Sequence, residues 1–321
     1  MLACVSLVLL TARCSSKVEG SSPSPDAATG TASADGPSGD GPTADAGTAP
    51  DVGTPTSTDA GVSLDAADSA TLTDGGRDFS TDRTTFFGDS RCADAGVELC
   101  EDFESGMIGP AWTVSGTKPV VDTMEHARGT HALHITQNGN GLSYIKETST
   151  FPAQNNTYFG RVFVYFKSLP TPPGMTYAHW TMLAASGTGV PGEIRVSGQL
   201  QSGKNLFGVG TDNQTDSGTG DWTNSDNDPK GAPLAVPLGQ WLCVEWMHKG
   251  DTNETQFWWD GALHPSLSTT ASMHGGNSNP YLLPKFTQVW VGWQEYQTSS
   301  EPFELWIDEI AIDSRRIGCV L

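Results

Sequence analysis

Residues 192–200 read GEIRVSGQL and alternate between polar and apolar side chains. In a β-strand, side chains at every second position share a face, so this stretch has one apolar face and one polar face. The polar face carries Glu193, Arg195, Ser197 and Gln199. A row with both charges, a hydroxyl and an amide offers more donors and acceptors than a solvated strand needs. The row is therefore a candidate ligand-binding surface.

Two other stretches extend this surface by the same alternation. Residues 178–186, AHWTMLAAS, place His179 and Thr181 on one face. Residues 288–296, QVWVGWQEY, place four side chains on one face: Gln288, Trp290, Gln294 and Tyr296. Aromatic rings stack on the apolar faces of sugar rings, and amides and charged groups hydrogen-bond to hydroxyls, so the set fits a polysaccharide. In the alternative interpretation, Trp290 and Trp293 belong to the core and the charges pair across strands.

The elements that hold these residues are strands. Residues 92–321 consist of short alternating or apolar runs separated by clusters of Gly, Pro, Asn and Asp, with almost no helical period. The pattern predicts an all-β domain with two packed antiparallel sheets, a β-sandwich. Asp260-Gly261 predicts a tight hairpin turn. Trp222, in the Gly-rich run GTDNQTDSGTGDW, is a candidate stacking residue at the rim of the surface.

The N-terminal part of the chain has a different composition. Residues 15–91 hold thirteen Asp and Glu against four Lys and Arg, with no Trp, Tyr or Cys, which predicts a disordered linker. Residues 1–14 form an apolar run that ends at Cys14, as in a bacterial lipoprotein signal, where this Cys would be lipidated. An ordinary secretory signal is the alternative. Both predict export, to the cell exterior or the outer-membrane surface.

Charge and cysteine content limit the function further. The chain carries a formal net charge of −20, which argues against binding to nucleic acid or to an anionic membrane surface. We therefore expect the protein to associate with a membrane only through a lipid anchor. Of the three possible pairings of the domain's cysteines, the short loop favours Cys92–Cys100, which leaves Cys243–Cys319. No Cys and His spacing fits zinc.

The stretches LCEDFESGMIGPAW, HARGTHALHI, QWLCVEWMHKGDTNETQFWWDG and ELWIDEIAIDSRRIGC, in this order, resemble a concanavalin A-like jelly roll of the secreted polysaccharide-lyase-like kind. The resemblance is to the cellulose-induced proteins of fungi and to glucuronan and alginate lyases, and it covers nearly all of 92–321. It implies a monomer with a structural calcium held by Glu104, Arg128, His131 and Asp308. Carboxylate and carbonyl oxygens suit calcium, and His131 would contribute only its carbonyl.

The resemblance also implies a reaction. A lyase neutralises a uronate carboxylate, removes the C5 proton and protonates the leaving oxygen. Here Arg195 with Gln199 or Gln294 would neutralise the carboxylate, and either His179 or Tyr296 would be the base. Of the three alginate lyase motifs, the first is kept only as Glu193-Ile-Arg195 and the second is missing. In the third, Gly292 aligns, but Gln294 occupies the position of the catalytic Tyr, and Tyr296 lies two residues later. A groove that binds glycans without cleaving them is the alternative.

Glycoside hydrolysis is disfavoured. Retaining hydrolases of this fold class place two Glu on one strand face, and no such triplet occurs here. Strict alternation along ELWIDEI places Asp308 and Glu309 on opposite faces, which favours a calcium role for Asp308 over a catalytic pair.

Overall fold

The computed structural model describes residues 76–138, 140–171, 174, 178–212, 224–226, 232–275, 280–296 and 302–321. The predicted lipidation site Cys14 and the predicted stacking residue Trp222 lie outside the described residues. No helix in the described ranges has the length and apolar character needed to cross a membrane.

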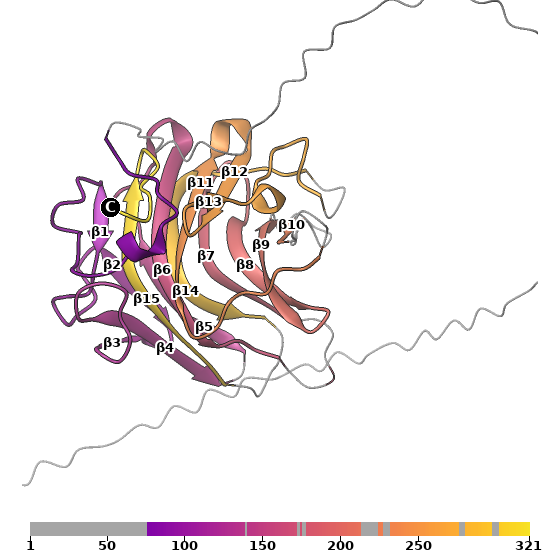
Figure 1. Cartoon of the computed structure of the whole chain (residues 1–321). Coiled ribbons are helices and arrows are strands. Elements are labelled where there is room, and N and C mark those ends of the chain that lie inside the picture. Colours follow the sequence, from indigo (N-terminus) through magenta and orange to yellow (C-terminus); the bar gives the residue numbers. More distant parts are fainter. Residues whose placement is uncertain are drawn as a thin grey trace, which may run out of the picture. The chain divides into compact units, whose positions relative to one another are not determined.

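The described chain is built from strands and a few short 3₁₀ turns, and its two sheets face each other (Figure 1). The strands are β1 (Leu99–Glu101), β2 (Trp112–Gly116), β3 (Val120–Asp122), β4 (Ala132–Asn138), β5 (Gly141–Glu147), β6 (Thr157–Ser168), β7 (His179–Thr188), β8 (Glu193–Gln201), β9 (Lys204–Asp212), β10 (Asn224–Ser225), β11 (Trp241–Lys249), β12 (Glu254–Trp259), β13 (Ala262–Leu263), β14 (Lys285–Glu295) and β15 (Pro302–Asp313). The 3₁₀ turns are η1 (Arg83–Thr85), η2 (Gln154–Asn156), η3 (Gly250–Thr252) and η4 (Pro265–Leu267).

One sheet has eight strands, in the order β13-β12-β11-β6-β15-β4-β3, with β1 paired to β15. The other has seven strands, in the order β10-β9-β8-β7-β14-β5-β2. The pairings between these strands are antiparallel, so the predicted all-β, two-sheet sandwich is confirmed. The predicted hairpin turn is also present, because β12 and β13 pair through Trp259 and Ala262 and leave Asp260-Gly261 as the turn.

The core lies between the sheets and uses the apolar face of each strand. Ile194 and Val196 of β8 belong to it, together with Trp180 of β7. The Trp180 indole stacks on Trp293 of β14 at 5.1 Å between ring centroids. The Trp180 ring lies over Gly198, where an added Cβ would come within 2.0 Å of the indole. The alternation in the sequence therefore correctly predicts which side chains of β8 face the core.

Alternation fails in β15. The register of β15 against β6 shifts between Asp308 and Ala311, and Glu309 has a φ of 47°. Ile307 and Ile310 both belong to the core, so the two acids between them share the outer side. Both bond to Arg128, Asp308 to its main-chain N–H and Glu309 to its guanidinium. The prediction that these acids lie on opposite faces is wrong, because a β-bulge adds a residue to the strand.

The folded part also begins earlier than expected. Residues 76–91 pack onto the domain, although their polar composition places them in the predicted linker. Phe86 is fully buried in a small cluster with Phe163 and the Cys243–Cys319 pair. Arg77 forms an ion pair with Asp313 near the end of β15. The buried Phe86, the partly buried Phe87 packed beside it and a few ion pairs hold this segment, and composition averaged over 77 residues does not reveal them.

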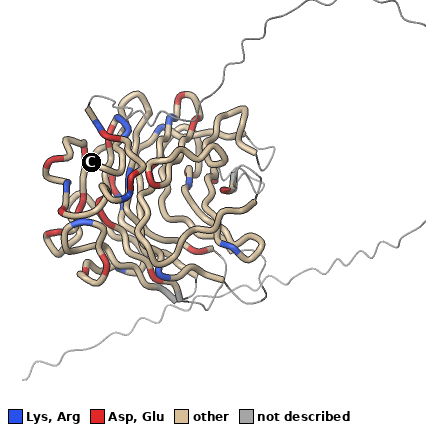
Figure 2. Tube along the Cα trace, viewed as in Figure 1, with Lys and Arg blue, Asp and Glu red and all other residues tan. Residues whose placement is uncertain are grey.

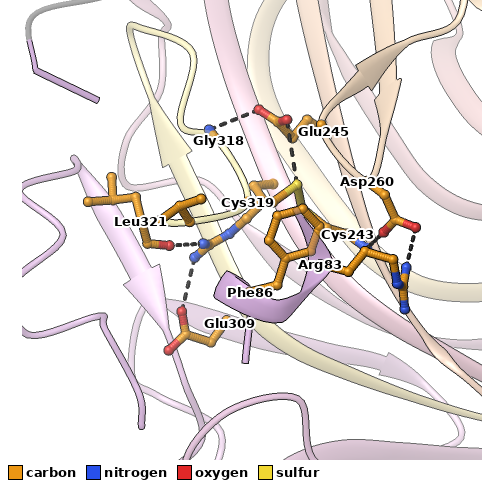
Figure 3. Close-up of a disulfide and its surroundings, with 12 residues drawn as sticks. Arg83, Phe86, Cys243, Glu245, Asp260, Glu309, Gly318, Cys319 and Leu321 are labelled. Atoms are coloured by element: carbon orange, nitrogen blue, oxygen red, sulfur yellow. Dashed lines mark hydrogen bonds and ion pairs between the residues drawn. A yellow bond between two sulfur atoms is a disulfide. The ribbon is translucent and has the colours of Figure 1, made fainter. Parts of the chain in front are cut away.

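Both predicted disulfides are present, Cys92–Cys100 and Cys243–Cys319. The second ties β11 to the C-terminal segment, beside the buried Glu245, which accepts a hydrogen bond from the Gly318 N–H at 2.9 Å (Figure 3). Within the described ranges, two groups of Cys and Glu lie close enough to suggest a metal, but each contains a disulfide. A half-cystine has no thiolate to offer, so neither group is a metal site.

Candidate functional site

The polar residues predicted to share a surface lie on the face of the seven-stranded sheet that points away from the core. None of them belongs to the core cluster. The cross-strand registers set them in rows: Gln294 pairs with Thr181 and Thr181 with Ser197, while His179 pairs with Gln199. The next strand, β9, presents Gly208 and Gly210 opposite Ser197 and Arg195, so no β9 side chain stands beside these two residues.

Tyr296, just after β14, joins the predicted catalytic residues into one cluster. Its ring stacks on His179 with 4.3 Å between ring centroids and 9° between the planes. The Tyr296 hydroxyl lies 3.2 Å from Thr181 Oγ1, which is 3.0 Å from Ser197 Oγ. The Arg195 guanidinium lies 4.8 Å from the centre of the Tyr296 ring. The Tyr296 phenol therefore contacts both the His179 imidazole and the Arg195 guanidinium on one face of the sheet.

Arg195 is held by two carboxylates, Glu193 on its own strand and Asp212 on the neighbouring strand β9. Its Nε donates to Glu193 at 2.8 Å, and its terminal nitrogen donates to Asp212 at 2.6 Å. Burial acts to lower the pKa of Arg195, but the attraction of Tyr296, Glu193 and Asp212 outweighs burial and raises it. Arg195 thus stays charged, with its position fixed by charge-assisted hydrogen bonds on two sides.

Trp290 extends the surface across β14 towards β5. Its indole N–H donates to Glu193 at 3.3 Å, which links it to the Arg195 pair. Its ring stacks on Tyr144 with 4.5 Å between centroids. Trp290 lies outside the core cluster but is only 4% exposed, whereas Trp293 lies in the cluster. The alternative interpretation therefore holds for Trp293, and in part for Trp290, which is buried on the outward face beneath Tyr144. Its cross-strand charge pairing is also present, between Arg195 and Asp212.

The predicted amides lie on the same face but are less closely connected. Gln288 donates to Ser186 Oγ at 2.7 Å, and Gln199 donates to the Gln201 side chain at 3.2 Å. Gln294 sits one strand from Thr181. Ser197, Gln199 and Gln294 therefore lie near the Tyr296 cluster, whereas Gln288 lies at the other end of β14, beside Ser186.

Sequence reasoning missed three residues of this face. Asp212 of β9 pairs directly with Glu193 in register and supplies the second carboxylate to Arg195. Tyr144 and Lys146 come from β5, and Lys146 pairs with Trp290 in register. The alternation in LSYIKE was a usable signal for β5. The pairing of Asp212 with Glu193 depends on the register between β8 and β9, which cannot be predicted from a single sequence.

The predicted calcium ligands meet at the loop before β4. Both oxygens of the Glu104 carboxylate face this loop: Oε1 accepts from the N–H groups of Thr130 and His131 at 2.8 Å, and Oε2 from the Thr130 hydroxyl. Burial acts to raise the pKa of Glu104, but these hydrogen bonds outweigh it and lower the pKa. Glu104 is thus ionised and lies against Gly129, where an added Cβ would come within 2.4 Å of its carboxyl group.

Asp308 reaches the same loop from the last strand. It is fully buried, and its Oδ2 accepts from the N–H groups of Ala127 and Arg128 at 2.9 and 3.0 Å. The Arg128 side chain points elsewhere: it bonds Glu309 at 2.8 Å and the carbonyl of Phe86 at 2.6 Å. Arg128, like His131, could therefore serve a cation only through its main-chain carbonyl. Two carboxyl groups and two loop carbonyls are oxygen donors of the kind calcium prefers. Without an ion, burial raises the pKa of Asp308 to about 8, and the oxygens of both acids accept hydrogen bonds from the loop, so the donor types fit calcium but these hydrogen bonds would have to rearrange for the ion to bind.

No family model matches this sequence, and no curated protein matches it. Among solved structures, the chain is similar to the cellulose-induced protein Cip1, with 22% identity and a TM-score of 0.50 over 69% of this chain and 100% of that chain. It is also similar to the alginate lyase AlyC3, with 12% identity and a TM-score of 0.39 over 57% and 74% of the two chains. The botulinum neurotoxin serotype G binding domain gives 11% identity and a TM-score of 0.43 over 70% and 49%. The likeness to the cellulose-induced protein concerns the fold, and together with the two antiparallel sheets it shows that this chain is a jelly-roll β-sandwich, as predicted.

Proposed function

We propose that this chain is an exported carbohydrate-active protein that binds a polysaccharide on the outward face of β7, β8 and β14 and cleaves a uronic-acid-containing glycan by β-elimination. The observation that carries the proposal is the Tyr296 cluster. A phenol and an imidazole in stacked contact, beside a fixed cation, supply a base and an acid within the reach of one sugar ring. Two disulfides support export, because such bonds persist in oxidising compartments.

In this reaction a base removes the C5 proton, the C4–O bond breaks, and the departing oxygen takes up a proton. His179 and Tyr296 are the candidates for both proton transfers, and Thr181 orients the Tyr296 hydroxyl. The carboxylate that acidifies the C5 proton belongs to the same sugar, so we assign its contact to Arg195, which lies against the Tyr296 ring. We assign a carboxylate on a neighbouring sugar to Lys146. Lys146 lies beside Trp290 and forms no ion pair with another described residue.

Calcium is part of this proposal as a structural ion. Glu104 and Asp308 would hold it with the carbonyls of Arg128 and His131, and it would supply charge that binds the early loop to the last strand. The reaction needs no proton transfer at that site, which belongs to the other sheet.

The proposed reaction is tested by the ultraviolet absorbance of the unsaturated uronate that β-elimination leaves on the product. The wild-type chain is incubated with glucuronan, alginate and polygalacturonate, with and without calcium. We expect absorbance to rise with at least one polymer and to be lost in both Tyr296→Phe and His179→Ala. The matched control is Tyr165→Phe, on the outer face of the eight-stranded sheet, which should keep full activity. If no polymer gives this absorbance, the lyase proposal is wrong.

A second candidate function is glycan binding without cleavage. The specific observation that favours it is the double pairing of Arg195, which reduces its capacity to neutralise a uronate carboxylate. A binding module would be retarded in gels that contain a glycan, would release no unsaturated product, and would keep this retardation in Tyr296→Phe.

A further inference from the structure

A pocket of about 450 Å³ opens at one edge of the sandwich, where the edge strand β2 of one sheet meets the edge strand β3 of the other. It shares no residue with the candidate glycan surface or with the calcium loop. Its lining consists of Gly106, Met107, Ile108, Trp112, Val114, Lys118, Pro119, Val120 and Val121.

The floor of this pocket is part of the hydrophobic core. Trp112 is a buried member of the core cluster, and Ile108 and Val121 pack against that cluster. Val114 pairs in register with the core residue Ile145, so it points between the sheets, yet 39% of it is exposed. At this edge, therefore, the apolar interior of the sandwich is accessible from solvent.

The rim carries a concentration of exposed apolar side chains. Met107 is 67% exposed and Val120 is 54% exposed. Single exposed apolar residues are ordinary on protein surfaces, but a group of them around a concave opening marks a binding site. A volume of about 450 Å³ lies within the range of small-molecule pockets.

Lys118 gives the pocket a charge. It is exposed, lies among the lining residues, and forms no ion pair with another described residue. Its ammonium group is therefore available to an anion that enters the opening. We propose that the pocket binds a small anionic amphiphile, with the apolar body between β2 and β3 and the anionic head at Lys118.

The test uses the full chain and two probes, the fluorescent anion 8-anilinonaphthalene-1-sulfonate and octanoate. We expect the dye to fluoresce with the folded protein and octanoate to displace it. Val114→Asp should weaken dye binding at least tenfold, because it places a charge inside the pocket. Met107→Asp, in an exposed loop that tolerates a charge without unfolding, should weaken it several-fold. The matched control is Leu263→Asp, an exposed apolar residue on the opposite edge strand β13, which should leave binding unchanged.

The role of Lys118 is tested by comparing octanoate with octanol. Lys118→Gln should weaken octanoate two- to fivefold, as expected for an exposed ion pair, and leave octanol unchanged. Equal losses for both ligands would contradict the charge assignment. Dye binding that is unchanged in Val114→Asp and Met107→Asp would show that the dye binds elsewhere and would overturn the proposal. A dimer that light scattering detects in wild type and not in these variants would also overturn it, because the opening would then bind a second copy of the chain.

Discussion

Acidification should destabilise this protein through one buried histidine. His248 of β11 is fully buried: its Nδ1 lies 2.8 Å from the Tyr158 hydroxyl, and its ring stacks on Phe286. Burial lowers the pKa of His248 from 6.5 to about 3. The unfolded chain therefore takes up this proton at a higher pH than the folded chain does. The contribution of His248 to stability is complete well above pH 6.5 and is lost as the pH falls from about 6.5 towards 3.

The size of the effect follows from the difference between the two pKa values. Each unit of difference corresponds to about 1.4 kcal/mol, so full titration would cost about 5 kcal/mol. At pH 5 the unfolded state is already stabilised by about 2 kcal/mol, while His248 in the folded state is still neutral. His248→Gln removes the titrating group, and its amide can still hydrogen-bond to Tyr158.

The assay is urea unfolding followed by tryptophan fluorescence at pH 7.5 and pH 5. Wild type should lose about 2 kcal/mol more than His248→Gln between these pH values, and the difference cancels the contributions of all other groups. His126→Gln, at an exposed position, should behave as wild type. If wild type and His248→Gln lose equal stability, His248 is protonated in the folded state and its burial against Phe286 is wrong.

Two other predictions concern cross-links between distant parts of the chain. Replacing Cys243 and Cys319 by Ala removes a disulfide between residues separated by 76 positions in the sequence. The loss should lower the free energy of unfolding by about 4–5 kcal/mol, because the unfolded chain gains conformational entropy. An unchanged midpoint of urea unfolding would contradict this prediction. Calcium at a hundredfold excess over its Kd should add about 2.7 kcal/mol to the free energy of unfolding, measured as a rise in Tm that a chelator reverses. Glu104→Gln should abolish this rise, and the control Asp251→Asn should keep it. A rise that persists in Glu104→Gln would mean that the ion binds elsewhere.

Alternation predicted much of the fold and the shared face of the candidate site. A strand has a period of two, so the sequence of β8 is enough to separate Arg195 and Ser197 from Ile194 and Val196. The same period in β14 places Trp290 outward and Trp293 in the core. The catalytic and binding roles of these residues stay predictions.

The features that the sequence did not predict depend on strand register and on irregular backbone conformation. Asp212 contacts Arg195 because β9 pairs with β8 in one particular register, and no local pattern encodes that choice. The bulge at Glu309 adds one residue and brings it to the side of Asp308, which strict alternation excludes. Phe86 and Phe87 are two apolar residues inside a largely polar segment, so their packing depends on the tertiary structure and not on a local pattern.

The central claim is that glycans bind on the outward face of the seven-stranded sheet. Figure 2 shows that acidic and basic residues are spread over the described domain, so charge alone does not mark this face. Affinity electrophoresis in gels with a panel of glycans, neutral and uronic, tests it directly. Trp290→Ala should lose the retardation that wild type shows, and Trp241→Ala, which removes a partly exposed ring from the other sheet, should keep it. Retardation that survives Trp290→Ala and disappears in Trp241→Ala would contradict the account.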